Sequence, residues 1–132
     1  MAFFMPILNP ASVAEYIEFG LYGFALSRFS GTWVGFKAIS ETVEGAASVE
    51  LCDPPRFRVP EDYAAPAYGL HYRWPDLPGP QVEGRMVAKL DAVRAFVRAN
   101  PIDRAIYNIP DAKFGIITTG KAHLDLMEAL RL

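Results

Sequence analysis

The order of strand-like and helix-like patterns in the first part of the chain constrains its fold more than any other feature. An apolar run at 3–8 ends at Asn9-Pro10, where Asn can cap a helix and Pro suits a first turn. Residues 10–28 then place apolar side chains at helical spacing, and 32–39 is rich in β-forming residues. A strand, a long helix and a second strand in this order predict an α/β fold with flanking helices and an open, mostly parallel sheet.

The predicted helix at 10–28 is apolar almost all the way round. One stripe falls at i, i+4, i+8 and i+11, and it consists of Val13, Ile17, Leu21 and Phe24. Other apolar or small residues widen this surface: Tyr16, Phe19, Gly20, Gly23 and Leu26. We therefore expect the helix to be covered on more than one side, and Ser30-Gly31 to end it.

The middle of the chain is rich in proline. Eight of its eleven prolines lie between Pro54 and Pro101, which predicts an irregular segment at 52–80 that crosses a surface. A short strand at 48–51 is the last regular element expected before it. The segment 81–99 then has the pattern of an amphipathic helix, whose apolar stripe is Val82, Met86, Leu90, Val93 and Val97.

The last part of the chain predicts two more strands and a helix. The strands are expected at 104–109 and 113–118, and the helix at 121–131. Thr118, Thr119 and Gly120 would then lie at the carboxyl end of a strand and the amino end of a helix, where open α/β sheets bind anions. The alternative is a structural turn in which a threonine caps the helix.

A phosphate-loop pattern at Gly115–Lys121 is excluded as a nucleotide site. Ala122 stands where the magnesium-binding Ser or Thr is needed, and Ile116-Ile117 would be inside a buried strand rather than in an open loop. We therefore predict no nucleotide hydrolysis.

Two cations remain as candidate binding residues. Arg28 could bind a carboxylate or phosphate, or it could neutralise the carboxyl end of the helix dipole. Lys37 lies in an apolar strand pattern, so its charge needs a partner: Glu41 or Glu44 in one reading, an anion in a cleft at the edge of the sheet in the other.

Composition excludes several functions. The formal net charge is −2 and no run of Lys and Arg occurs, so nucleic-acid binding is not predicted. No segment has the pattern of a membrane span or a signal peptide, which favours a cytoplasmic location. Cys52 is the only cysteine, so the chain cannot ligate an iron–sulfur cluster by itself. His71 and His123 lack metal-ligand spacing, and we predict no metal site.

Three phrases, in order, resemble the indolepyruvate ferredoxin oxidoreductases of the 2-oxoacid:ferredoxin oxidoreductase group. They are Pro6–Arg28 (PILNPASVAEYIEFGLYGFALSR), Ser30–Lys37 (SGTWVGFK) and Gly115–Leu130 (GIITTGKAHLDLMEAL). The match in between is loose. Members of this family are much longer, so the resemblance implies an internal fragment made of pieces of two adjacent domains.

The resemblance implies a place for each part of the chain. Residues 1–51 would end the domain that binds against the thiamine pyrimidine, 52–110 would be a proline-rich crossing segment that contains the helix 81–99, and 111–132 would begin a transketolase C-terminal-like domain. The parent enzyme would oxidatively decarboxylate aryl pyruvates to acyl-CoA, with thiamine diphosphate, Mg²⁺ and [4Fe-4S] clusters as cofactors. Its partners would be ferredoxin and coenzyme A, and the full-length protein would be a homodimer.

None of the family's cofactor-binding or catalytic motifs matches a position in this chain. The resemblance therefore assigns no catalytic residue, and it implies that the isolated chain binds no cofactor and is inactive without the remaining domains. The alternative is a stand-alone α/β interaction or ligand-binding module that shares only ancestry with the family.

Overall fold

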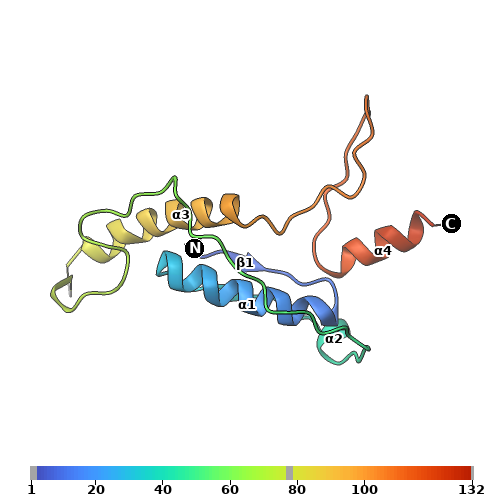
Figure 1. Cartoon of the computed structure of the whole chain (residues 1–132), viewed down its shortest axis with the longest axis horizontal. Helices are drawn as coiled ribbons and strands as arrows, with labels where there is room; N and C mark the ends of the chain where they lie inside the picture. The colour runs from blue at the N-terminus through green and yellow to red at the C-terminus, as the bar shows by residue number, and fades with distance from the viewer. Residues whose placement is uncertain (1–2, 77–78, 132) are drawn as a thin grey trace.

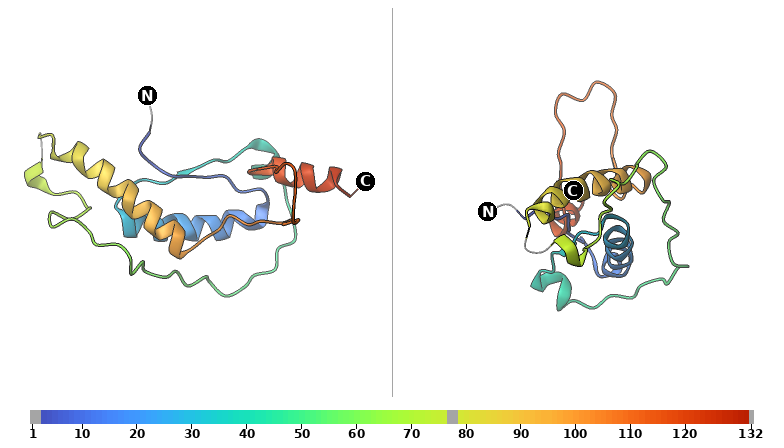
Figure 2. Two further views of the ribbon diagram at one scale, coloured as in Figure 1. Left: turned by 90° about the horizontal axis from the view of Figure 1, so that it is seen from above. Right: turned by 90° about the vertical axis from the view of Figure 1, so that its left-hand side faces the viewer.

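The computed structural model describes residues 3–76 and 79–131. Two strands, β1 (Ile7–Leu8) and β2 (Gly35–Phe36), form a sheet. The helices are α1 (Val13–Ser30), α2 (Ser40–Val43), α3 (Gln81–Ala99) and α4 (Lys121–Ala129), and η1 (Trp74–Asp76) is a 3-10 turn. Figure 1 and Figure 2 show α1 and α3 next to each other and α4 apart from them.

The two strands pair in parallel, as the sequence predicts. Ile7 is opposite Gly35 and Leu8 opposite Phe36, and α1 connects the strands. The strands have two residues each, so the predicted spans 3–8 and 32–39 are too long. Each strand has a neighbour on one side only in the described part of the chain, and a ladder of two strands alone is marginal.

Helix α1 begins at a variant of the capping box that was not predicted from the sequence. The Ser12 hydroxyl accepts a hydrogen bond from the Glu15 amide at 3.4 Å, and the Glu15 carboxylate accepts one from the Ala11 amide at 2.6 Å. Asn9 is therefore not the cap, and the helix begins at 13 rather than 10. Gly31 ends it as predicted, with the left-handed φ of 70° that favours glycine.

The core forms where α1 packs on α3 and on β1. Its buried members are Leu8, Tyr22, Leu26, Val93 and Phe96. The Tyr22 and Phe96 rings meet edge to face with centroids 5.4 Å apart, a favourable aromatic geometry. The sheet, α1 and α3 therefore share one hydrophobic core.

The predicted core stripe of α1 faces solvent. Ile17, Leu21 and Phe24 are 52%, 40% and 69% exposed, whereas Tyr22 and Leu26 are buried against α3. Because α1 is apolar almost all the way round, its spacing cannot show which side packs on α3. As expected, α1 is covered on more than one side, by α3 and by the strand segments, where Gly23 lies close to Leu8 and Val34. Neither covers Ile17, Leu21 and Phe24 in the described part of the chain, and we call these three residues the bare face of α1.

Helix α3 has the predicted bounds, and two of the five residues of its predicted stripe pack in the core as expected. Val93 and Val97 lie in or against the core. Val82 and Met86 are exposed because the first half of α3 extends past the end of α1, as Figures 1 and 2 show.

The irregular segment 52–80 is confirmed for its described residues, in which η1 is the one helical element. It is held to the helices at a few points. Phe57 packs edge to face on Tyr22 with centroids 5.6 Å apart. The Arg58 amide donates to the Asn100 side chain at 2.7 Å, and the Asn100 amide group donates back to the Arg58 carbonyl at 2.9 Å.

The strands predicted at 48–51, 104–109 and 113–118 are wrong. Residues 103–117 are all exposed and form an arm that extends from the body, as Figure 1 shows. The arm reverses direction at a turn between Ile109 and Ala112, with Asp111 at φ 60°. Side chains suited to strands need a neighbouring strand to pair with, and none lies beside the arm in the described structure.

The chain exposes much more surface than a completed globule of its size. Its accessible surface is 10,373 Å², whereas a folded monomer of 14.6 kDa is expected to expose about 6,900 Å². The arm and the bare face of α1 both contribute apolar surface to this excess. No helix in the described ranges is long and apolar enough to cross a membrane.

Candidate functional site

Polar side chains from both ends of the chain meet at the carboxyl end of β1. Asn9 follows the strand, and its side-chain amide donates to the Thr119 hydroxyl at 3.1 Å. A Cβ on Gly120 would lie 2.6 Å from the Asn9 side chain, so a glycine is needed for this close approach. We call Asn9, Thr118, Thr119, Gly120 and His123 the polar cluster.

The first turn of α4 completes the polar cluster. The Thr118 hydroxyl and His123 Nδ1 are hydrogen-bonded at 3.3 Å. Lys121 donates to Asp125 at 2.6 Å, and this bond, with a smaller contribution from Glu41, raises the pKa of Lys121. Because these side chains are engaged with each other, the cluster is suited to holding α4 at the end of the sheet.

The structure corrects two expectations about the segment 118–120, the strand before it and the threonine cap. Gly120 does precede a helix, but 113–118 is not a strand, so the threonines do not lie at the end of one. The cap of α4 is Gly120, and no threonine side chain caps the helix. The anion-binding reading stays a prediction.

Lys37 and Arg28 lie at opposite ends of the unit formed by β1, α1 and β2. The Lys37 amide donates to the Leu8 carbonyl at 2.8 Å, which places its backbone beside the polar cluster. Its side chain is exposed and forms no ion pair within the described residues, so the predicted pair with Glu41 or Glu44 is wrong. The reason is that β2 ends at Phe36, which leaves the charge of Lys37 in water. Arg28 lies in the last turn of α1, where a cation stabilises the helix dipole.

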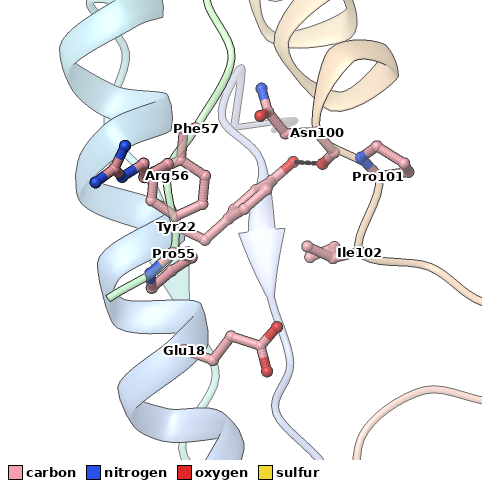
Figure 3. A pocket seen from close by; sticks show the side chains of 8 residues that line it. All are labelled: Glu18, Tyr22, Pro55, Arg56, Phe57, Asn100, Pro101 and Ile102. Carbon is pink, nitrogen blue, oxygen red and sulfur yellow. Dashed lines mark hydrogen bonds between the residues drawn. The ribbon is translucent and has the colours of Figure 1, made fainter. Parts of the chain in front are cut away.

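A pocket of about 200 Å³ lies between α1 and the chain that leaves α3. Figure 3 shows Tyr22 at its centre, pointing to Asn100, with Glu18 and Arg56 at its rim. The Tyr22 hydroxyl donates to the Asn100 carbonyl at 2.9 Å. Burial, with a contribution from Asp103, raises the pKa of Tyr22 to about 12.

This pKa predicts a loss of stability at high pH. Tyr22 titrates near pH 10 in the unfolded chain, so its contribution is complete below pH 10 and is lost as the pH rises toward 12. Tyrosinate absorbance of the folded protein should therefore include one late-titrating group that is missing in Tyr22→Phe. An unchanged titration in Tyr22→Phe would contradict the assignment, and Tyr72→Phe, at a 61% exposed position, is the control.

An apolar groove of about 390 Å³ lies at the other end of the sheet. Its apolar side chains come from the amino-terminal segment, from the chain before β2 and from α3: Phe3, Phe4, Met5, Trp33, Val82 and Met86. Lys89 is its one charged lining residue, and burial together with the nearby charge of Arg85 lowers the pKa of Lys89. We call this site the groove.

The packed side of α1 and a buried ion pair were not predicted from the sequence. The packed side of α1 is lined by Phe19, Tyr22, Leu26 and Phe29 at i, i+3, i+7 and i+10. The predicted stripe has a helical spacing too, so spacing alone does not distinguish the two sides. Asp76 and Arg85 form an ion pair in which both side chains are only 4% exposed. Nothing in the sequence distinguishes these two from other charges on the surface.

Within the described residues no group of His, Cys, Asp and Glu could hold a metal ion. Cys52 is exposed. Comparison with family models, with curated proteins and with solved structures finds no match.

Proposed function

We propose that this chain is a structural part of an indolepyruvate-type 2-oxoacid:ferredoxin oxidoreductase, in which it packs between domains and supplies no catalytic group. The main support for this proposal is the excess of exposed surface. The chain exposes 10,373 Å² in total, whereas a folded monomer of this mass is expected to expose about 6,900 Å². The excess includes the bare face of α1, the arm and the groove. Apolar surfaces of this extent are typical of interaction sites.

The architecture supports the same proposal. Parallel sheets are almost always buried on both faces, and the unit of β1, α1 and β2 has a helix layer on one face. Ile7 on the other face is 63% exposed. In our proposal the remaining domains of the enzyme supply the missing strands and cover, with 1–51 ending one domain, 52–110 crossing the surface and 111–132 beginning the next.

The cofactors of the proposed enzyme belong to those remaining domains. A [4Fe-4S] cluster takes four thiolates, and this chain has one cysteine. The polar cluster has its hydroxyl, amide and imidazole groups engaged internally, so it does not fit a diphosphate with Mg²⁺. We therefore derive no reaction step from this chain; oxidation of an aryl pyruvate, transfer to coenzyme A and reduction of ferredoxin in the cytoplasm would use groups outside it.

The isolated chain is expected to show no oxidation of indolepyruvate with thiamine diphosphate, Mg²⁺, coenzyme A and ferredoxin. Activity should appear when it is co-expressed with an indolepyruvate ferredoxin oxidoreductase that lacks the corresponding segment. Phe24→Asp on the bare face of α1 should weaken this rescue without unfolding the chain, whereas Glu83→Lys on exposed α3 should not. Turnover by the chain alone would contradict the proposal, as would a failure of the two parts to form a complex.

A further inference from the structure

The arm has the composition of an interface rather than of a surface loop. Six of its fifteen residues are large and apolar, and all of them are more than half exposed: Ile106, Tyr107, Ile109, Phe114, Ile116 and Ile117. Ile117 is 99% exposed. Loops that stay in water are normally polar, so this arm is expected to dock on an apolar surface.

The groove is a complementary surface on the same chain. Trp33 and Phe3 in its lining are 81% and 75% exposed. Lys89 lies in the groove with its charge partly desolvated and forms no ion pair within the described residues, so the site favours an apolar segment that carries a carboxylate. The turn at the end of the arm carries Asp111.

The arm and the groove lie at opposite ends of the sheet. The base of the arm is fixed at both of its ends, by Ile102 against the core and by Thr119 bound to Asn9 at the carboxyl end of β1. The groove is lined by Phe3, Phe4 and Met5, which precede the amino end of β1. This separation favours docking between molecules over docking within one.

We propose that the arm of one copy docks in the groove of a second copy, with Asp111 near Lys89, and that the exchange is reciprocal. A reciprocal exchange between two copies closes on itself and buries both surfaces of each chain. This inference does not rest on the proposed function. It concerns the chain without the remaining domains, which would otherwise compete for the same surfaces.

The available surface is large enough for a stable dimer. The excess over a folded monomer is about 3,500 Å² per chain, and permanent interfaces bury about 1,000–2,500 Å² of each partner. The excess is therefore larger than an interface of this class needs, and the arm and the groove are both part of it.

The first test is sedimentation of the full chain at increasing micromolar concentration. We expect a closed dimer, and Ile109→Asp or Met86→Asp should each weaken it by about tenfold or more, because a carboxylate would be buried in an apolar contact. Ile17→Asp, a matched change on the bare face of α1, should leave the dimer intact. A monomer throughout, an open series of larger species, or a dimer that Ile17→Asp alone disrupts would each overturn the proposal.

The second test distinguishes docking between copies from docking within one. Cys52→Ser removes the one native thiol, and Ile109→Cys, beside the turn of the arm, and Met86→Cys are then placed on separate chains. Mixing the two under oxidation should give a disulfide-linked dimer of one chain of each kind in preference to either like pair. A lack of this preference would overturn the arm-to-groove arrangement. The result does not depend on whether the chain restores activity to an incomplete oxidoreductase, so the two proposals are tested separately.

Discussion

Replacing Phe96 with Ala is expected to destabilise the chain by about 3–5 kcal/mol, which could abolish folding in water. Phe96 is 3% exposed and contacts the aromatic rings of Tyr22, Phe29 and Phe57. The Phe96 ring therefore packs α3 against both α1 and the irregular segment. Chemical denaturation followed by circular dichroism measures the loss.

Phe114→Ala is the matched control, because it removes the same side chain from the arm. Phe114 is 79% exposed, so the free energy of unfolding of the monomer should change by less than about 0.5 kcal/mol. Equal losses for the two variants would show that the contact between α1 and α3 is not the core of this protein.

Replacing Asp76 with Ala is expected to cost about 3–5 kcal/mol, because it leaves the buried guanidinium of Arg85 without its counter-ion. The Arg85 Nη1 also donates to the His71 carbonyl at 2.7 Å, so the pair holds the irregular segment against α3. The double variant Asp76→Leu with Arg85→Met should recover most of the loss, since apolar groups of similar volume can replace a buried pair. Denaturation midpoints of the single and double variants measure this coupling.

The exposed pair of Asp91 and Arg94 is the control for this cycle. Both side chains are more than half exposed, and Asp91→Ala should change stability by no more than about 1 kcal/mol. If the double variant at 76 and 85 were as unstable as Asp76→Ala alone, the ion pair would not be the cause of the loss.

The elements that could be predicted from the sequence are those whose signals are local. Helix α3 was predicted with its observed bounds because one amphipathic pattern and a final Asn-Pro determine it. Gly31 was predicted to end α1 because a left-handed cap favours glycine. The parallel order of β1, α1 and β2 follows from pattern alone.

The wrong or missing predictions concern features that depend on residues far away in the sequence. The packed side of α1 is chosen by α3, whose core residues follow some seventy positions later, and a helix that is apolar all round gives no local hint. The predicted strands at 104–109 and 113–118 have suitable residues but no strand to pair with in the described structure. The polar cluster joins residues 110 positions apart, and no spacing rule links Asn9 to Thr119.

The irregular segment 52–80 should tolerate changes in its length. The segment touches the helices at separate points, such as Phe57 on Tyr22 and the Tyr63 hydroxyl on the Ala88 carbonyl at 3.3 Å. Between such points the entropy of closing a loop rises only with the logarithm of its length, so doubling a stretch costs about 0.6 kcal/mol. Residues inserted between Ala64 and Ala65, which are both exposed and outside any regular element, should therefore be accommodated while the two helices keep their packing.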